Sequence, residues 1–516
     1  MERDALPLDR RLRQEILFAR ERVYRFGQPT PLEHLVLPGH GPGPEIWVKR
    51  EDLSPIKAYK WRGACNRMAV LTPEERAAGV VTASAGNHAQ GVALAARALG
   101  IAARIYMPAS TPRVKQAAVR HHGGHHVEIL LAGDHYDDAV GAAKEDAAAS
   151  GATYIHAYDD LHVMAGQGTL ADEIVLSGHG PFDAAYLQIG GGGMAAGVSE
   201  WLKTYWPGIE LVGVEGSGQA SMKIALEAGK PVPLDQLDIF CDGTAVRKAG
   251  ELPFEICRET LSRVVTVTNS EVSRAIRQLW EGLRCVSEPS GAMGLAAVMQ
   301  EREKLAGKRV LIVISGANID FLQLGLIAQS EGSAPTASRS LRVRIPERPG
   351  TMLELLDTCF AGLSITDFQY GKIHAADAWP AFTVGAEDPA LIEALPDKLA
   401  AGGFEWEDMS GAVDLAFRAI PLRADLLGHP AFLRLDFYER RGALHDFLDK
   451  LVRGRASLCY FNYRQSGERI GRALIGLDFA SEAERDAFVS SVPEHGEGYR
   501  SCKAVDEKTR GRLLGE

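Results

Sequence analysis

The segment AAYLQIGGGGMAAG, residues 184–197, joins an apolar run to an Ala-rich run through four consecutive glycines. The apolar run is typical of a buried strand, and the Ala-rich run after the glycines is typical of a helix. Glycines let the backbone fold tightly and turn several N–H groups toward one point, and the start of the next helix adds a favourable dipole. The segment therefore predicts a strand, an anion-binding loop suited to phosphate, and a helix. It matches neither common glycine-rich nucleotide-binding pattern, so it leaves the phosphorylated ligand unnamed.

The same alternation extends on both sides of this segment, from about residue 45 to 325. Short apolar runs such as EIWVK, GVVTASA, ARIYMP, IELVGVEG and RVLIVIS alternate with helical stretches. Buried strands that alternate with helices favour an α/β fold with a mostly parallel sheet covered on both faces. Ligands bind such sheets at the carboxyl ends of the strands, so the loops that follow the strands are the expected site.

Length, charge and cysteine content limit the class of protein. A chain of 516 residues is expected to form two or more domains, and a net charge of −10 without a Lys/Arg-dense stripe gives nucleic-acid binding little support. No apolar run approaches the ~20 residues that span a bilayer, and the first residues resemble neither a secretory signal nor a transit peptide. The seven cysteines are scattered, which suits reduced thiols. We therefore expect a cytoplasmic protein that binds neither nucleic acid nor membrane.

A second kind of sequence begins near residue 331. Residues 331–340, EGSAPTASRS, are small and polar, as in a linker. Beyond them, LRVRIPERPGTMLELLD from Leu341 corresponds to LRLDFYERRGALHDFLD from Leu433, and residues 364–370 correspond to residues 457–463. Each copy predicts a strand, a glycine turn, an amphipathic helix and a strand. The expected organisation is a large domain over 1–330, a linker over 331–340, and two small α+β domains over 341–415 and 430–510.

Two further loops have the same position after a strand. SAGNHAQG, residues 84–91, opens a helix; Ser84 is a typical N-cap, the backbone N–H groups suit a carboxylate, and Asn87 offers an amide. SGAN, residues 315–318, follows RVLIVI, so Ser315 is either a hydrogen-bonding site residue or a cap. KAYK places Lys57 and Lys60 three positions apart, and these residues alone do not say which lysine has a chemical role.

Four histidines gather in RHHGGHHVE, residues 120–128. Gly123 and Gly124 interrupt any helix there, so the i, i+4 spacing of helical metal ligands is not available. We interpret the stretch as a helix end that turns into the strand VEILLAG, and we expect no metal site.

Together these motifs resemble the pyridoxal-phosphate enzymes of the tryptophan-synthase-β-like fold (fold type II), and among them the biosynthetic threonine dehydratases, or threonine deaminases. The matching segments, in the family's order, are KAYKWRGA, TASAGNHAQGVA, GQGT (166–169), GGGGMAAG, GTAV (243–246), EPSGA (288–292) and SGAN. The family motif S-F-K-x-R-G falls on residues 58–63, so its lysine is Lys60, and Lys57 becomes a flanking surface residue. Ala58 and Tyr59 stand where the family has serine and phenylalanine. The tail resembles the family's paired ACT-like (ferredoxin-like) regulatory domains.

The resemblance implies a role for each site residue. Lys60 would hold pyridoxal 5'-phosphate (PLP) and then act as the catalytic base. Glu288 would lie close to the cofactor ring. The other residues that would contact the cofactor are Asn87, Gly190, Gly191, Gly192, Gly193, Met194 and Ser315. The residues that would surround the substrate carboxylate are Ser84, Ala85, Gly86 and His88.

The implied activity is that of a lyase, which removes water from L-threonine to give a product that hydrolyses to 2-oxobutanoate and ammonia, and which acts on L-serine as well. This is the first committed step of isoleucine biosynthesis, so isoleucine, and often valine, would be allosteric effectors of a homotetramer. Two alternatives stay open: a degradative serine/threonine dehydratase without isoleucine control, and a catalytically silent amino-acid sensor. Arg441 replaces the proline of the Glu-Arg-Pro-Gly turn in the second repeat, which leaves ligand binding by that repeat open. A tail that serves only oligomer assembly is the alternative to regulation.

Overall fold

A computed structural model gives the fold of the chain in two compact units, residues 1–319 and 320–516. The first unit is described nearly throughout, over residues 6–37, 43–133 and 136–319. The described residues of the second unit are 320–332, 337–346, 351–369, 377–386, 388–410, 412, 422, 424–438, 447, 452, 455–464, 470–496 and 499–514.

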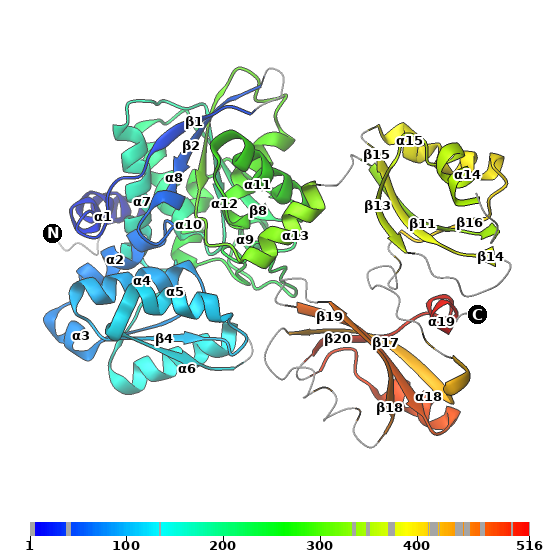
Figure 1. Cartoon of the computed structure of the whole chain (residues 1–516). Coiled ribbons are helices and arrows are strands. Elements are labelled where there is room, and N and C mark those ends of the chain that lie inside the picture. Colours follow the sequence, from blue (N-terminus) through cyan, green and yellow to red (C-terminus); the bar gives the residue numbers. More distant parts are fainter. Residues whose placement is uncertain are drawn as a thin grey trace. The chain divides into compact units, whose positions relative to one another are not determined.

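The first unit contains two sheets (Figure 1). In the larger sheet the strands lie in the order β1 (Leu32–Leu35), β2 (Glu45–Arg50), β10 (Arg309–Ile314), β7 (Ala184–Gln188), β8 (Glu210–Gly216) and β9 (Arg263–Val267). Only the pairing of β1 with β2 is antiparallel within this sheet. The smaller sheet is parallel, in the order β5 (Val127–Leu131), β4 (Ala103–Met107), β3 (Val80–Ala83) and β6 (Thr153–Tyr154).

The expected α/β class is confirmed, but the strands divide between two sheets rather than one. The chain leaves the larger sheet after β2, builds the whole smaller sheet from β3 to β6, and returns at β7. Each parallel strand has the same local sequence pattern, because each is buried against helices on its faces. The apolar runs therefore predicted the strands without indicating which sheet each would join.

Helices cover these sheets, and several of them form where the sequence is Ala-rich. The α-helices of the first unit are α1 (Leu8–Val23), α2 (Trp61–Ala69), α3 (Pro73–Ala78), α4 (Asn87–Leu99), α5 (Arg113–Gly123), α6 (Tyr136–Ser150), α7 (Leu161–Leu176), α8 (Gly193–Tyr205), α9 (Ser221–Ala228), α10 (Glu251–Thr260), α11 (Asn269–Leu283) and α12 (Pro289–Gln300). Helices α7 and α8 are buried along most of their length, and their small residues let them approach closely. A Cβ on Gly197 of α8 would lie 2.3 Å from the carbonyl oxygen of Met164 on α7. No described helix has both the length and the apolar composition needed to cross a membrane.

The histidine-rich stretch folds as its glycines indicate. Helix α5 ends at Gly123, a short 3₁₀ turn covers Gly124–His126, and β5 begins at Val127. Gly124 has φ 58°, in the left-handed region where glycine is favoured. The predicted helix end and turn are therefore confirmed.

The described part of the second unit contains two four-stranded antiparallel sheets, one from each sequence repeat, and a two-stranded pair of β12 (Ile345–Pro346) with β14 (Asp377–Ala378) in the first repeat. The elements of the first repeat are β11 (Ala337–Val343), α14 (Thr351–Thr358), β13 (Ser364–Gln369), β15 (Ala381–Ala386), α15 (Pro389–Glu393), α16 (Leu395–Ala401) and β16 (Trp406–Asp408). The elements of the second are β17 (His429–Tyr438), β18 (Ser457–Arg464), β19 (Ile470–Phe479), α18 (Glu482–Ser491) and β20 (Tyr499–Ala504). The strand orders are β13-β15-β11-β16 and β18-β19-β17-β20. Both place the second, third, first and fourth strands of a repeat side by side, as in a ferredoxin-like fold.

The two repeats also share a local irregularity. The pairing of β13 with β15 shifts register between Ile365 and Asp367, and the pairing of β18 with β19 shifts between Leu458 and Tyr460. These positions correspond in the sequence repeat, so each copy has a β-bulge at the same place. The repeat inferred from the sequence is therefore confirmed at the level of strand order and of this bulge.

Several predicted boundaries fall at the edge of the described residues. Helix α13 (Phe321–Gly332) and strand β11 occupy both ends of the segment predicted as a linker, 331–340. The two turns at residues 347–350 and 439–442, which include Arg441, lie outside the described residues. Of the helix predicted after the turn at residues 439–442, Phe447 is the one position described up to residue 449. The domain limits 1–330, 341–415 and 430–510 stay predictions.

Candidate active site

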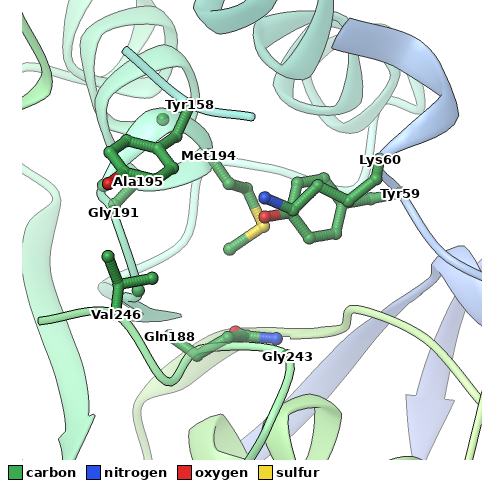
Figure 2. A pocket seen from close by; sticks show the side chains of 12 residues that line it. Tyr59, Lys60, Tyr158, Gln188, Gly191, Met194, Ala195, Gly243 and Val246 are labelled. Atoms are coloured by element: carbon green, nitrogen blue, oxygen red, sulfur yellow. The ribbon is translucent and has the colours of Figure 1, made fainter. Parts of the chain in front are cut away.

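A cavity lies at the carboxyl end of β7, where the sequence predicted a ligand site. Its lining residues are Tyr59, Lys60, Tyr158, Gln188, Gly190, Gly191, Gly192, Gly193, Met194, Ala195, Gly243 and Val246 (Figure 2). They come from four separate parts of the chain, and all of the glycine loop is among them.

The glycine loop forms one wall of the cavity as a bare backbone. The first hydrogen bond inside α8 runs from Ala196 N–H to Gly192 O at 2.8 Å. The N–H groups of residues 193–195 therefore have no partner within the helix, and they lie at its positive end. Gly192 has φ 94°, which an L side chain rarely adopts. This geometry suits an anion such as phosphate.

Close neighbours explain why the loop has glycine at successive positions. A Cβ on Gly191 would lie 2.2 Å from the ring of Tyr158, and a Cβ on Gly193 would lie 2.8 Å from the carbonyl oxygen of Tyr158. A Cβ on Gly190 would lie 2.9 Å from Cα of Thr244, in the GTAV segment. The loop is therefore held between Tyr158 and Thr244, and side chains would fill the cradle.

Lys60 brings an amine into the same cavity (Figure 2). The residue immediately precedes α2, and its Nζ donates to the carbonyl oxygen of Ala157 at 3.1 Å. Burial lowers the pKa of Lys60 to about 8, although the negative charge of Glu288 acts in the opposite direction. A larger fraction of this amine is neutral near neutral pH than for a surface lysine, which suits a nucleophile or a base.

The rate of cofactor capture by apoprotein is expected to depend on pH through Lys60. The neutral amine is the reactive form, so the rate should rise with pH, reach half of its maximum near pH 8 rather than near 10.5, and level off above that midpoint. Stopped-flow absorbance between pH 6 and 10.5 measures it. Glu288→Gln removes a charge that raises the pKa of Lys60, so this variant should move the midpoint to lower pH. A rate that still rises steeply above pH 9.5 would contradict the lowered pKa.

Lys57 lies apart from this chemistry. Its side chain is exposed, its backbone has φ 58°, and its carbonyl oxygen accepts from Ala317 N–H at 2.9 Å. The next residue, Ala58, is fully buried, and both its N–H and its carbonyl oxygen bond the hydroxyl of Ser54 at 2.9 Å. The backbone of residues 57–59 thus fixes the approach to Lys60, and the cavity receives the side chain of Lys60 rather than that of Lys57.

The loop at residues 84–88 opens helix α4, but its cap differs from the predicted one. The N-cap is Gly86, and the hydroxyl of Ser84 accepts from Gly86 N–H at 3.2 Å. Ser84 is therefore a turn residue, and the expectation that it caps the helix was wrong, because its hydroxyl is used two residues along. His88 is buried, its Nε2 lies 3.1 Å from Ile155 O, and burial lowers its pKa to about 3. Ala85 and Gly86 leave the loop without bulky side chains.

Asn87, Glu288 and Asn318 form a chain of hydrogen bonds. Asn87 Nδ2 donates to both carboxylate oxygens of Glu288, at 2.9 and 3.0 Å. Asn318 Nδ2 donates to Asn87 Oδ1 at 2.7 Å. Burial raises the pKa of Glu288 to about 7, and Asn87 opposes that shift. Ser315, at the end of β10, is buried, and its carbonyl oxygen accepts from Tyr59 N–H at 2.9 Å.

The remaining family motifs have packing roles beside the cavity. GQGT lies in α7, where Gln167 Oε1 accepts from Gly63 N–H at 3.3 Å, so it packs against the helix that follows Lys60. EPSGA places Glu288 at the N-cap of α12. Sequence reasoning missed Tyr158 and Asn318. Tyr158 lies in the loop IHAYDD, residues 155–160, which has no glycine, and Asn318 was assigned no role within SGAN.

An amine with a lowered pKa and an anion cradle made of backbone, which line the same cavity, fit an aldehyde cofactor that carries a phosphate. Pyridoxal phosphate has both groups. The fit rests on Lys60 and on a glycine loop that side chains would fill.

Comparisons with known proteins agree with this geometry. A family model described as pyridoxal-phosphate dependent enzyme matches residues 23–316, and a model described as the C-terminal regulatory domain of threonine dehydratase matches residues 424–507. The biosynthetic L-threonine dehydratase IlvA of Haemophilus influenzae is 36% identical over 475 residues, which cover 90% of each chain. IlvA of Escherichia coli is 36% identical over 468 residues, 88% of this chain and 89% of that protein.

A solved structure of the processed form of threonine deaminase isoform 2 from Solanum lycopersicum is 37% identical, with a TM-score of 0.59. The match covers 62% of this chain and 93% of that one. Because the sequence similarity extends along both the large domain and the tail, the chain belongs to the biosynthetic threonine dehydratase family of pyridoxal-phosphate-dependent enzymes.

Proposed function

We propose that this protein is a PLP-dependent threonine ammonia-lyase, which converts L-threonine to 2-oxobutanoate and ammonia at the start of isoleucine biosynthesis. The observation that carries the proposal is that the Lys60 amine and the glycine cradle line the same cavity. Relatives named as biosynthetic threonine dehydratases match 90% of the chain, which supports threonine as the substrate. When bound, PLP supplies an electron sink for the bonds at the substrate's Cα.

Each site residue has a proposed task in this reaction. Lys60 would hold the cofactor through its amine, and the free amine would take the substrate's Cα proton as general base. The lowered pKa of Lys60 provides the neutral form that this step needs. The backbone N–H groups of Gly190, Gly191, Gly192, Gly193 and Met194 hold the phosphate. Asn87 donates to the oxygen on the cofactor ring, and Glu288 lies beside it.

Ser315 favours elimination over transamination. We place its hydroxyl opposite the ring nitrogen, where the family has this residue. A neutral hydroxyl would not hold a proton on that nitrogen as a carboxylate would. Negative charge at the substrate's Cα would then be relieved by loss of the β-hydroxyl, protonated and released as water, which is the reaction of a dehydratase.

The first turn of α4 supplies the proposed contacts to the substrate's carboxylate. Helix α4 begins at Asn87 after a cap at Gly86, so its N-terminal N–H groups are available to an anion. Ser84, Ala85, Gly86 and His88 surround this position, with His88 contributing its backbone. L-Serine has the same α-carboxylate and β-hydroxyl, so we propose it as a second substrate.

The tail carries the proposed regulation. Its two repeats share one strand order, and the second falls in the segment that matches the regulatory domain of threonine dehydratase. We propose isoleucine, and valine, as the effectors of a cytoplasmic homotetramer. The seven cysteines are free thiols, which agrees with a reducing compartment.

Isoleucine is expected to lower the rate of 2-oxobutanoate formation from subsaturating L-threonine at least ~5-fold, the lower end of usual allosteric coupling. The reason is that isoleucine binds a second site and stabilises a state with weaker affinity for threonine. The assay compares full-length protein with and without isoleucine, and equilibrium dialysis measures isoleucine binding to protein saturated with a non-reactive threonine analogue.

The outcomes of this assay separate the proposals. Inhibition together with isoleucine binding at the saturated protein supports a separate regulatory site. Threonine turnover that is indifferent to isoleucine leaves the lyase standing and points to the degradative role. Absence of turnover in protein that holds PLP would contradict the lyase and favour a silent amino-acid sensor.

A further inference from the structure

The side-chain amide of Asn87 has to present its nitrogen, not its oxygen, to serve the proposed cofactor contact. A hydrogen-bond donor is needed there, and an amide rotated by half a turn would present an acceptor instead. A neighbouring group must therefore select one orientation of the Asn87 amide. The contacts of Asn318 show that its side chain is that group.

The donor and acceptor roles of these groups can be assigned by starting from one backbone carbonyl, that of Ile56. Ile56 O is a backbone carbonyl, which only accepts, and it lies 2.8 Å from the side chain of Asn318. The atom of Asn318 that faces it must therefore be the amide nitrogen. That nitrogen has a second hydrogen, and it lies 2.7 Å from Asn87. Asn87 must accept at this point, so it presents Oδ1.

Because Oδ1 of Asn87 faces Asn318, the amide nitrogen of Asn87 faces the other way, toward Glu288. It lies 2.9 and 3.0 Å from the two oxygens of Glu288. Glu288 alone does not select this orientation, because its carboxyl group donates a proton when protonated and accepts when ionised. Ile56 O has no such alternative.

We infer that Asn318 is a positioning residue, which fixes the Asn87 amide with its nitrogen toward Glu288 and so makes Asn87 a donor to the cofactor. Asn318 also ties this orientation to the chain that carries Lys60. Ala317 N–H donates to Lys57 O at 2.9 Å, and Tyr59 N–H donates to Ser315 O at 2.9 Å. The SGAN segment thus connects the amide of Asn87 to the backbone that precedes Lys60.

A double-mutant cycle on the holoenzyme tests this inference, with PLP as the probe. The dissociation constant for PLP and the position of its visible absorption band are measured for Asn87→Ala, Asn318→Ala and the double variant. Asn318→Ala should weaken PLP binding about tenfold, the size expected for one hydrogen bond to a charged or polarised group. It should shift the band in the same direction as Asn87→Ala. The double variant should match Asn87→Ala within about twofold, because Asn318 acts through Asn87.

Two further variants separate positioning from folding. Asn318→Asp keeps the shape of the side chain but removes both donors, so it should reproduce the band shift even if Asn318→Ala folds poorly. Asn66 makes the same kind of bond elsewhere, with Nδ2 donating to His162 O at 2.7 Å. Asn66→Ala is the control for loss of a buried amide, and it should leave the band in place.

The inference rests on the proposed cofactor role of Asn87, and the cycle distinguishes the two failures. If Asn87→Ala changes neither affinity nor band, the role of Asn87 is wrong and the inference falls with it. If Asn87→Ala changes both while Asn318→Ala and Asn318→Asp change neither, Asn87 keeps its orientation unaided. If the losses of PLP affinity in Asn87→Ala and Asn318→Ala add in the double variant, the positioning role is also overturned.

Discussion

Lys60→Ala is expected to lower the rate of 2-oxobutanoate formation from L-threonine by at least ~10³-fold, within the range for loss of a positioned general base. The effect is large because one amine holds the cofactor and then takes the Cα proton. No other lysine lines the described part of the cavity, so none takes over. The measurement is the turnover rate of purified protein at saturating L-threonine and PLP.

Lys57→Asn is the matched control. Lys57 lies three positions away, its side chain is exposed, and its φ of 58° is one that asparagine tolerates. Turnover by this variant should stay within about twofold of the unmodified protein. Equal losses of turnover in Lys57→Asn and Lys60→Ala would show that any substitution in this segment lowers activity, whichever lysine it removes. Full activity in Lys60→Ala would remove the lysine from the mechanism.

Gly191→Ala is expected to weaken PLP binding up to ~100-fold, since overpacking of this kind costs ~1–3 kcal/mol. The new Cβ would lie 2.2 Å from the ring of Tyr158, so either the ring or the loop must move. The loop carries the N–H groups proposed to hold the phosphate, and any displacement misaligns them. Equilibrium titration of apoprotein with PLP measures the loss.

Gly208→Ala is the control for the glycine change, because nothing lies within 4 Å of the position that its Cβ would take. It should leave PLP affinity unchanged within about twofold. Adding Tyr158→Ala to Gly191→Ala removes the ring with which the new Cβ clashes, so part of the affinity for PLP should return. Normal affinity in Gly191→Ala would mean that the phosphate is not held by this loop.

Some features followed from the sequence because the residues there admit few alternatives. Four glycines between a strand and a helix indicated a bare backbone cradle, and the structure has one between β7 and α8. The sequence repeat after residue 340 indicated two copies of one small domain, and both strand orders agree. The resemblance to the family distinguished Lys60 from Lys57, which spacing alone did not.

Other features required coordinates because they depend on contacts distant in sequence. Tyr158 forms the wall beside Gly191 although nothing in its local sequence marks it. The hydroxyl of Ser84 had two possible uses, a cap or a turn, and only the position of Gly86 N–H decides between them. The bond from Asn318 to Asn87 joins residues 231 positions apart, so no local pattern reports it.

The most direct test of the central claim is a titration of apoprotein with PLP while L-threonine turnover is measured. If Lys60 and the glycine cradle form one active site per chain, the rate should rise linearly and level off at one PLP per chain. 2-Oxobutanoate and ammonia should then appear in equal amounts. Threonine turnover that persists without PLP, or none at one bound PLP per chain, would contradict the account.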